Sequence, residues 1–228
     1  MAKTKQIEVE IKSLLQTKEA VESLISRMRG IDKNFTLTGK NKQLNHYFTS
    51  GNFNKLHQNI KHHIPKDKQE YFVEIIEKSQ GHSVRTRKAD DTVIFVVKAT
   101  LDDTSSSNGT ARLEFETTIS NLFLEELDQI LLDSDFEYQA KWSRERHEYL
   151  YKNYNVSIDK NAGYGYLAEF ERILSDQDDF NAVKGEIRRE MEVLGITELQ
   201  QDRLARMFDF YNKNWPEYYG TEKTFTIL

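Results

Sequence analysis

The sequence contains no cysteine, which excludes disulfide bonds and metal sites built from thiolates. Any bound metal ion must therefore be held by carboxylates, histidines or water. The sequence also lacks an apolar run near the roughly 20 residues that a membrane-spanning helix needs. Its first residues lack the apolar core of a signal peptide. We therefore expect a cytoplasmic protein with no membrane partner.

Proline is scarce, with only Pro65 and Pro216 in 228 residues, and no long linker divides the chain. Positive charge is not in excess either, because the formal net charge is −5. This balance argues against a general binder of double-stranded nucleic acid, since such domains are usually basic. The net charge is nevertheless compatible with a local basic cavity.

Short segments that alternate polar and apolar residues fill most of the first three quarters of the chain. Many short alternating strands favour a barrel or a sandwich over a parallel sheet. The segment 102–110 (DDTSSSNGT) is typical of a hairpin loop between two of them. The expected strands are 6–12, 44–49, 83–88, 92–101, 111–119, 136–143, 146–151, 156–160 and 166–174.

Helical spacing of apolar residues appears between these strands. It predicts one helix from a Thr17 cap to a stop at Gly30, and another from a Ser120 cap to about Leu132. The latter should include Phe123 on its apolar face. Residues 52–80 are polar and partly helical, and we interpret them as an insertion on the surface.

Beyond residue 176 the pattern becomes helical, with a glycine break at Gly195. We therefore predict two parts. Residues 1–175 form the strand domain, and residues 176–228 form a helical extension packed on it. The aromatic side chains near the C-terminus favour core packing over stacking on a base.

Charged residues alternate with apolar ones on several strands, and the charges are sorted by sign. On the first strand, Glu8, Glu10 and Lys12 share one face. Taken alone, this pattern is typical of a solvated face. Like charges then recur on separate strands, as the pairs Arg85/Arg87, Glu114/Glu116 and Glu169/Glu171.

Like charges on one face of a strand repel, so each pair needs an opposing partner. A metal ion offsets the carboxylate pairs, and an anion offsets the arginines. If one barrel lumen encloses both, it forms a site for a metal-bound polyanion. The apolar sides of the strands would then face outward and be covered by helices.

On these residues the chain resembles the CYTH, or triphosphate tunnel metalloenzyme, superfamily. The ExExK hallmark of that family corresponds to Glu8, Glu10 and Lys12, and its other motifs follow in order over residues 6–174. The resemblance implies an α+β fold in which a closed eight-stranded antiparallel β-barrel, the triphosphate tunnel, is surrounded by helices. Those further motifs are Arg85 with Arg87, Lys98, Glu114 with Glu116, Lys141 with Arg144 or Arg146, Asp159, Gly165, Glu169 and Glu171.

The resemblance also implies that acidic residues hold Mg²⁺ or Mn²⁺ and that basic residues bind phosphate. The metal-side candidates are Glu8, Glu10, Glu114, Glu116, Asp159, Glu169 and Glu171. The phosphate-side candidates are Lys12, Arg85, Arg87, Lys98, Lys141, Arg144 and Arg146. The residues expected to carry catalysis are Glu8, Glu10, Lys12 and Glu169.

The reaction expected first is hydrolysis of a triphosphate, either inorganic tripolyphosphate or a nucleoside or thiamine triphosphate. The alternative reaction is that of a class IV-type adenylyl cyclase, which makes cyclic AMP and pyrophosphate from ATP. A third possibility from another class is a sensor that binds a polyphosphate or nucleotide without turnover. The expected state is a monomer or a homodimer.

Two further features have competing interpretations. His57, His62 and His63 lack a carboxylate at helical spacing that would complete a metal site, so a solvated surface is favoured. Tyr47 suits a substrate contact and a packed aromatic equally well.

Overall fold

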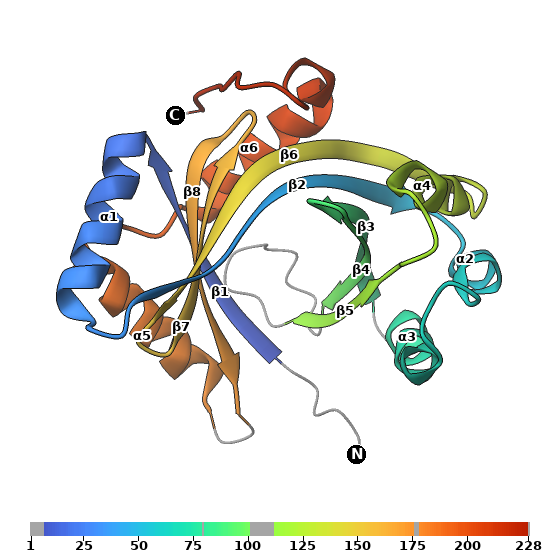
Figure 1. Cartoon of the computed structure of the whole chain (residues 1–228), viewed down its shortest axis with the longest axis horizontal. Helices are drawn as coiled ribbons and strands as arrows, with labels where there is room; N and C mark the ends of the chain where they lie inside the picture. Colours follow the sequence, from blue (N-terminus) through green and yellow to red (C-terminus); the bar gives the residue numbers. More distant parts are fainter. Residues whose placement is uncertain (1–6, 79, 101–111, 176–177, 228) are drawn as a thin grey trace. The chain divides into compact units, whose positions relative to one another are not determined.

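The computed structural model describes residues 7–78, 80–100, 112–175 and 178–227. These residues form an α+β fold with an eight-stranded antiparallel sheet and six α-helices (Figure 1). The predicted α+β class is thus confirmed. The described chain divides into two compact units: unit 1 holds residues 7–41, 144–175 and 178–227, and unit 2 holds residues 42–78, 80–100 and 112–143.

Unit 1 is built around strand β8, which pairs antiparallel with β1 on one side and with β7 on the other. Strand β7 also pairs with the second half of β6. The elements of this unit are β1 (Ile7–Gln16), α1 (Lys18–Ile31), the start of β2 (Thr36–Ser50), the end of β6 (Phe136–Tyr151), β7 (Tyr154–Asn161), β8 (Gly165–Leu174), α5 (Phe180–Val193), α6 (Gln201–Asn214) and the 3₁₀ helix η1 (Trp215–Glu217).

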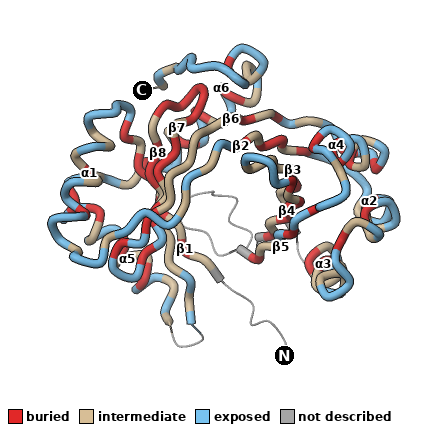
Figure 2. The backbone as a smooth tube through the Cα atoms, viewed as in Figure 1, coloured by how far each residue is buried: buried red, intermediate tan, exposed pale blue. Residues whose placement is uncertain are grey.

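The core of unit 1 lies on the apolar face of these strands. Val9 and Ile11 of β1 and Phe170 of β8 are fully buried there, because alternate residues of a strand point to the same face. Helices α1 and α5 cover this face (Figures 1 and 2). Met28 and Ile187 are among the buried side chains that they contribute. The opposite face is left to polar residues.

Unit 2 contains three consecutive antiparallel pairings, β2 with β3, β3 with β4, and β4 with β5. Phe72, Phe95 and Phe115 lie together in its core, with ring centroids 5.1 to 6.2 Å apart. The elements of this unit are most of β2, α2 (Phe53–Ile60), α3 (Lys66–Lys78), β3 (Gln80–Ala89), β4 (Thr92–Thr100), β5 (Arg112–Thr118), α4 (Leu124–Leu132) and the start of β6.

Residues 52–80 were expected to form a surface insertion, and this expectation is wrong. The segment forms α2 and α3, which bury Leu56, Ile60, Phe72 and Ile75 against the sheet of unit 2. These apolar residues are few, but they stand at helical spacing, so a mostly polar segment still presents a continuous buried stripe. The segment is a layer of the core.

Two strands are longer than the alternation indicates. The predicted strands 136–143 and 146–151 are one continuous strand, β6, because the polar residues between them pair with β7 from Arg144 onward. Strand β2 begins at Thr36 instead of residue 44. Its residues 36–38 are exposed, Leu37 included, so burial leaves no alternating pattern in this part of the sequence.

The predicted helix ends are partly confirmed. Thr17 caps α1 by accepting a hydrogen bond from the Ala20 amide at 3.2 Å, whereas Gly30 lies inside the helix and does not end it. Helix α4 starts at Leu124, after Ser120, because the Glu126 carboxylate accepts the Phe123 amide at 2.7 Å and fixes the first turn there. Phe123 is consequently 76% exposed.

The helices predicted after residue 176 are present as α5 and α6, and the aromatic C-terminal residues pack as expected. Tyr164 and Tyr211 lie against Phe225, with ring centroids 5.4 and 6.4 Å away. Gly163 has a φ of +85°, and a Cβ there would lie 2.7 Å from the Tyr211 ring, so this turn requires glycine. The C-terminal segment is thereby fixed to the β7–β8 turn.

Several expectations stay predictions. Closure of the eight strands into one barrel needs pairing between the two units. The division at residue 175 also stays a prediction, and the predicted hairpin loop 102–110 lies outside the described residues. Over the described ranges, none of the helices has both the length and the apolar character needed to cross a membrane.

The role of α3 in the core can be tested by truncating Phe72. Phe72→Ala should lower the free energy of unfolding by about 3–5 kcal/mol, because it leaves a cavity among buried rings. Glu77→Ala, at an exposed position of the same helix, should change it by less than about 0.5 kcal/mol. Urea denaturation followed by circular dichroism measures both. Equal, small effects would mean that α3 is the surface insertion first expected.

Candidate active site

The polar face of unit 1 is a set of charged side chains from four strands. Alternation places Glu8, Glu10 and Lys12 of β1 opposite the buried residues of that strand. The antiparallel register puts Lys12 directly across from Glu169 of β8, and Glu10 across from Glu171. The hallmark strand and the last acidic strand of the sequence are therefore neighbours.

Lys12 lies between two carboxylates. Its Nζ is 2.7 Å from Oε1 of Glu10 and 2.7 Å from Oε1 of Glu169, and all three side chains are at least 86% buried. Burial alone would lower the pKa of Lys12, but the two carboxylates outweigh it and raise this pKa above its ordinary value. Burial likewise acts to raise the pKa of Glu169, but Lys12 and then Arg146 hold it well below its ordinary value. Lys12 and Glu169 are therefore charged at neutral pH.

Asp159 of β7 is held by both candidate arginines of β6. Arg146 lies directly across from it and binds it through Nε and Nη2, both at 2.8 Å, and Arg144 Nη1 approaches Oδ2 at 2.7 Å. Arg146 also reaches Glu169 at 3.2 Å, which links this group to Lys12. Burial favours the neutral acid, but Arg144 and Arg146 lower the pKa of Asp159.

The sequence reasoning missed one carboxylate of this face, Glu148. It follows Arg146 by two residues on β6, so it shares the same face, and it lies across from Ser157 of β7. Ser157 is itself across from Glu169. A Cβ at Gly39 of β2 would lie 2.5 Å from Oε2 of Glu148, so glycine leaves room for this carboxylate. Alternation within the predicted strand 146–151 already places Glu148 on the face of Arg146, so the sequence did carry a signal for it.

The polar face of unit 2 carries the predicted basic residues. Lys98 of β4 lies across from Glu114 of β5, and their charged atoms are 2.7 Å apart. Arg85 Nη2 is 3.9 Å from the same carboxylate, and Arg87 Nη1 is 3.3 Å from Glu116. Burial would raise the pKa of Glu114, but Lys98 and then Arg85 lower it.

Two polar residues of β2 hold the arginines from the other side. Tyr47 is across from Arg85 and Asn45 is across from Arg87. Arg85 Nη1 donates to the Tyr47 hydroxyl at 2.8 Å, and Arg87 Nε donates to Asn45 Oδ1 at 2.8 Å. Tyr47 therefore contacts a candidate phosphate-binding group, and Asn45 is a residue of this face that the sequence reasoning missed.

Lys141 is the one basic candidate of unit 2 that the structure places elsewhere. Its Nζ lies 4.1 Å from the ring centroid of Tyr138, and this ring packs against the core residue Phe48 at 4.8 Å. The structure thus brings Arg85, Arg87 and Lys98 together, whereas the Lys141 ammonium lies over the Tyr138 ring.

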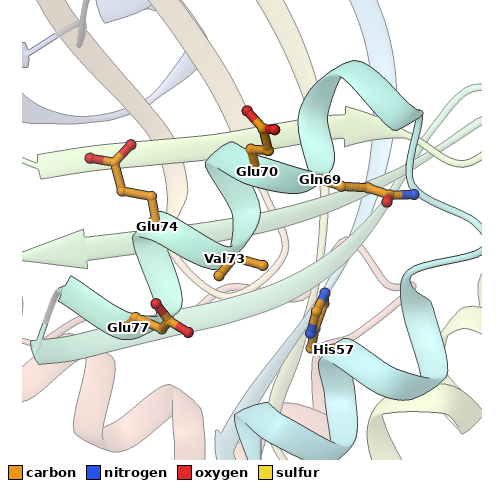
Figure 3. Close-up of a pocket in the computed structure, with 6 residues that line it drawn as sticks. All are labelled: His57, Gln69, Glu70, Val73, Glu74 and Glu77. Atoms are coloured by element: carbon orange, nitrogen blue, oxygen red, sulfur yellow. The ribbon is translucent and has the colours of Figure 1, made fainter.

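The three histidines near residue 60 are found on the helical side of unit 2. Nδ1 of His63 lies 3.0 Å from Nδ2 and 3.3 Å from Oδ1 of Asn121. His57 of α2 lines an open groove of about 460 Å³ together with residues of α3 (Figure 3). Glu70, Glu74 and Glu77 line this groove as well, whereas Phe72 on the same helix packs into the core. The groove is distinct from the charged face of the sheet.

The comparison with known families agrees with the resemblance found in the sequence. The CYTH domain matches residues 6–204 of this chain. The chain belongs to the CYTH family. The matched region includes the hallmark strand, both polar faces and α5, so it extends past the domain boundary predicted at residue 175.

Solved structures show the same fold at low sequence identity. One is a conserved hypothetical protein from Pyrococcus furiosus, 18% identical over 83% of this chain and 91% of that chain, with a TM-score of 0.59. A putative adenylate cyclase from Vibrio parahaemolyticus is 12% identical over 90% and 99%, with a TM-score of 0.59. The putative adenylyl cyclase HpAC1 from Hippeastrum is 14% identical over 90% and 96%, with a TM-score of 0.52. No curated protein sequence matches the chain.

The carboxylates of this CYTH chain suit a hard divalent cation chemically. Mg²⁺ and Mn²⁺ prefer oxygen ligands, and the ammonium of Lys12 shows that Glu10 and Glu169 converge on one positive charge. In the described part of the chain, no three carboxylates or histidines are close enough together to form a ligand group. A metal ion at this point therefore requires the Lys12 side chain to turn away.

The ion pairs of Asp159 predict a pH-dependent stability. A depressed carboxylate pKa adds stability that is present above its unfolded value, near 4, and is lost as the pH falls through the folded value. Asp159→Asn should lower the free energy of unfolding at pH 7 by about 3–5 kcal/mol, because two buried guanidinium groups lose their partner. Between pH 5 and pH 3, the free energy of unfolding of Asp159→Asn should fall by less than that of the wild type.

Chemical denaturation at a series of pH values measures this difference. Asp209→Asn is the control, because Asp209 is exposed and pairs with Lys213 at 2.7 Å on the surface. It should leave both the stability and its pH dependence nearly unchanged. A similar result for Asp159→Asn would show that this buried group does not stabilise the fold.

Proposed function

We propose that this CYTH chain hydrolyses a triphosphate in a metal-dependent reaction inside a closed eight-stranded tunnel. Members of the family are triphosphatases or cyclases, so the chain belongs to a family of enzymes that act on triphosphates. The proposal depends on one observation, which is the different charge of the two polar faces. A metal–triphosphate complex needs carboxylates for its cation and basic groups for its anion.

Among the described side chains, the face of unit 1 has three more carboxylates than basic groups, and the face of unit 2 has one more basic group than carboxylates. Unit 1 therefore favours cations, and unit 2 favours anions. The charged residues of the first face are Glu8, Glu10, Lys12, Arg144, Arg146, Glu148, Asp159, Glu169 and Glu171. Those of the second are Arg85, Arg87, Lys98, Glu114 and Glu116.

On the metal side, Glu8, Glu10, Glu169 and Glu171 would hold Mg²⁺ or Mn²⁺. The chemistry that a bound divalent ion supplies is neutralisation of the phosphate oxygens and of the leaving group. The contacts of Asp159 favour another role for it: with both oxygens bound by Arg144 and Arg146, it orients these two groups. Glu114 and Glu116 would orient Lys98, Arg85 and Arg87 in the same way.

On the phosphate side, Arg85, Arg87 and Lys98 would bind the triphosphate oxygens. Guanidinium groups can donate two parallel hydrogen bonds to one phosphate, and both arginines are already oriented by Tyr47 and Asn45. Lys12, Arg144 and Arg146 would add charge from the first face. Exclusion of water by a closed tunnel would strengthen each of these interactions.

Hydrolysis is favoured over cyclisation by one structural relative. HpAC1 from Hippeastrum, named as a putative adenylyl cyclase, is described as having a dominant triphosphatase activity. Cyclisation of ATP remains the second candidate, because the Vibrio parahaemolyticus relative is named as a putative adenylate cyclase. Binding without turnover, a cytoplasmic location and a monomeric or homodimeric state also stay as predictions.

Product analysis separates these reactions. The purified protein is incubated with ATP, GTP, thiamine triphosphate or tripolyphosphate, with Mg²⁺ or Mn²⁺. We expect orthophosphate from at least one substrate and no product when the metal is chelated. Cyclic AMP with pyrophosphate would establish the cyclase instead. Tight binding of a triphosphate without any product would show that the chain is a sensor.

The division of the site into two sides predicts different kinetic defects. Glu169→Gln should lower kcat by about 100-fold or more, the scale found when one charge-stabilising group is removed. Arg85→Ala should instead raise KM by about 10-fold or more, because a charged hydrogen bond contributes about 1.5–3 kcal/mol. Steady-state assays with the preferred substrate measure both.

Arg188→Ala is the control for loss of one positive charge, because Arg188 is exposed on α5 and pairs with Glu198 at 2.6 Å. It should leave kcat and KM unchanged. Wild-type kcat in Glu169→Gln would refute the metal side as proposed, and wild-type KM in Arg85→Ala would refute the phosphate side.

A further inference from the structure

A buried carboxylate on α4 binds the reverse side of the strands that carry the two arginines. Asp128 belongs to the apolar stripe of this helix, beside Leu124, Leu127 and Leu131, and it is 2% exposed. A carboxylate at such a position costs several kcal/mol unless its oxygens are hydrogen-bonded. The Asp128 carboxylate therefore needs hydrogen-bond partners within the core.

These partners come from three different strands of unit 2. Oδ1 of Asp128 accepts a hydrogen bond from the Thr86 hydroxyl of β3 at 2.5 Å. Oδ2 accepts from Nδ1 of His46 on β2 at 2.6 Å and from the Tyr138 hydroxyl of β6 at 2.7 Å. One side chain thus connects a helix to three strands in a place where water does not reach.

The register relates this network to the polar face. His46 lies directly across from Thr86, and both point to the core. On β3, Thr86 stands between Arg85 and Arg87, whose side chains leave the strand on the opposite face. The hydrogen bond between Thr86 and Asp128 therefore fixes the β3 backbone at the residue between the two arginines.

The same relation holds on β2, where His46 stands between Asn45 and Tyr47. These neighbours bind the arginines, with Arg87 to Asn45 and Arg85 to Tyr47 each at 2.8 Å. A shift of β2 against β3 would break both hydrogen bonds at once. Fixing the two strands from the core side is therefore a way to fix the direction of both guanidinium groups.

We propose that Asp128 is a positioning residue, which with His46, Thr86 and Tyr138 aligns Arg85 and Arg87 for binding of the triphosphate. The proposal rests on the function proposed above. Asp128 does not contact the substrate, and its effect passes through the two arginines. A purely structural role would instead change stability without changing affinity for the anion.

The experiment measures binding of inorganic tripolyphosphate by calorimetry, without metal, well below the melting temperature of each variant. Asp128→Asn should raise Kd by about 10-fold, since the amide nitrogen cannot accept the hydrogen bonds that one oxygen accepts. Thr86→Val, which removes one donor at similar volume, should raise Kd in the same direction and serves if Asp128→Asn does not fold. Glu126→Ala is the control, because it weakens the first turn of α4 without touching the strands.

A double-mutant cycle separates the two roles. In a chain that carries Arg85→Ala and Arg87→Ala, Asp128→Asn should add less than about twofold to Kd, because the groups through which it acts are gone. If Asp128→Asn raised Kd by the same factor with and without the two arginines, the proposal would be overturned. An unchanged Kd in Asp128→Asn and Thr86→Val would overturn it as well. A wild-type chain that neither binds nor converts any triphosphate would instead refute the proposed function, and this inference with it.

Discussion

The arrangement depends on one electrostatic constraint: a charge on a partly buried strand face needs an opposite charge beside it, on the same strand or on the neighbouring one. Lys12 meets this constraint with Glu10 and Glu169, and Asp159 meets it with two arginines. Because successive side chains point to opposite faces, a slip of one residue would move every such group into the apolar core. The ion pairs and the core therefore specify the same register.

The two faces of each strand have separate tasks that are linked through the backbone. In unit 1, Ile11 packs against the helices while its neighbours Glu10 and Lys12 form the charged face. In unit 2, the core side includes hydrogen bonds as well as apolar contacts, because Thr86 binds a carboxylate of α4. Directional bonds fix a strand more narrowly than apolar packing does, which suits the proposed binding of one triphosphate by both guanidinium groups.

Alternation in the sequence was enough to predict which face most charged residues occupy, and this explains why the family resemblance could be recognised. Alternation does not predict register, so the ion pairs of Asp159 with Arg144 and Arg146 could not be predicted. Nor could it reveal that β6 is one continuous strand, because the run of polar residues 143–148 breaks the alternation with apolar ones. Burial of Leu56 and Phe72 was missed because so few apolar residues mark α2 and α3.

The position of Lys12 connects cation binding to anion binding under the proposed function. Its ammonium occupies the point on which Glu10 and Glu169 converge, so a divalent ion held by these residues would compete with Lys12 for the same two carboxylates. Once displaced, a buried ammonium needs another negative partner, because an unpaired buried charge is costly. A phosphate group of the proposed substrate would supply that partner. By linkage, each ligand would then raise the affinity for the other, so that triphosphate and metal would bind as a complex more readily than either binds alone.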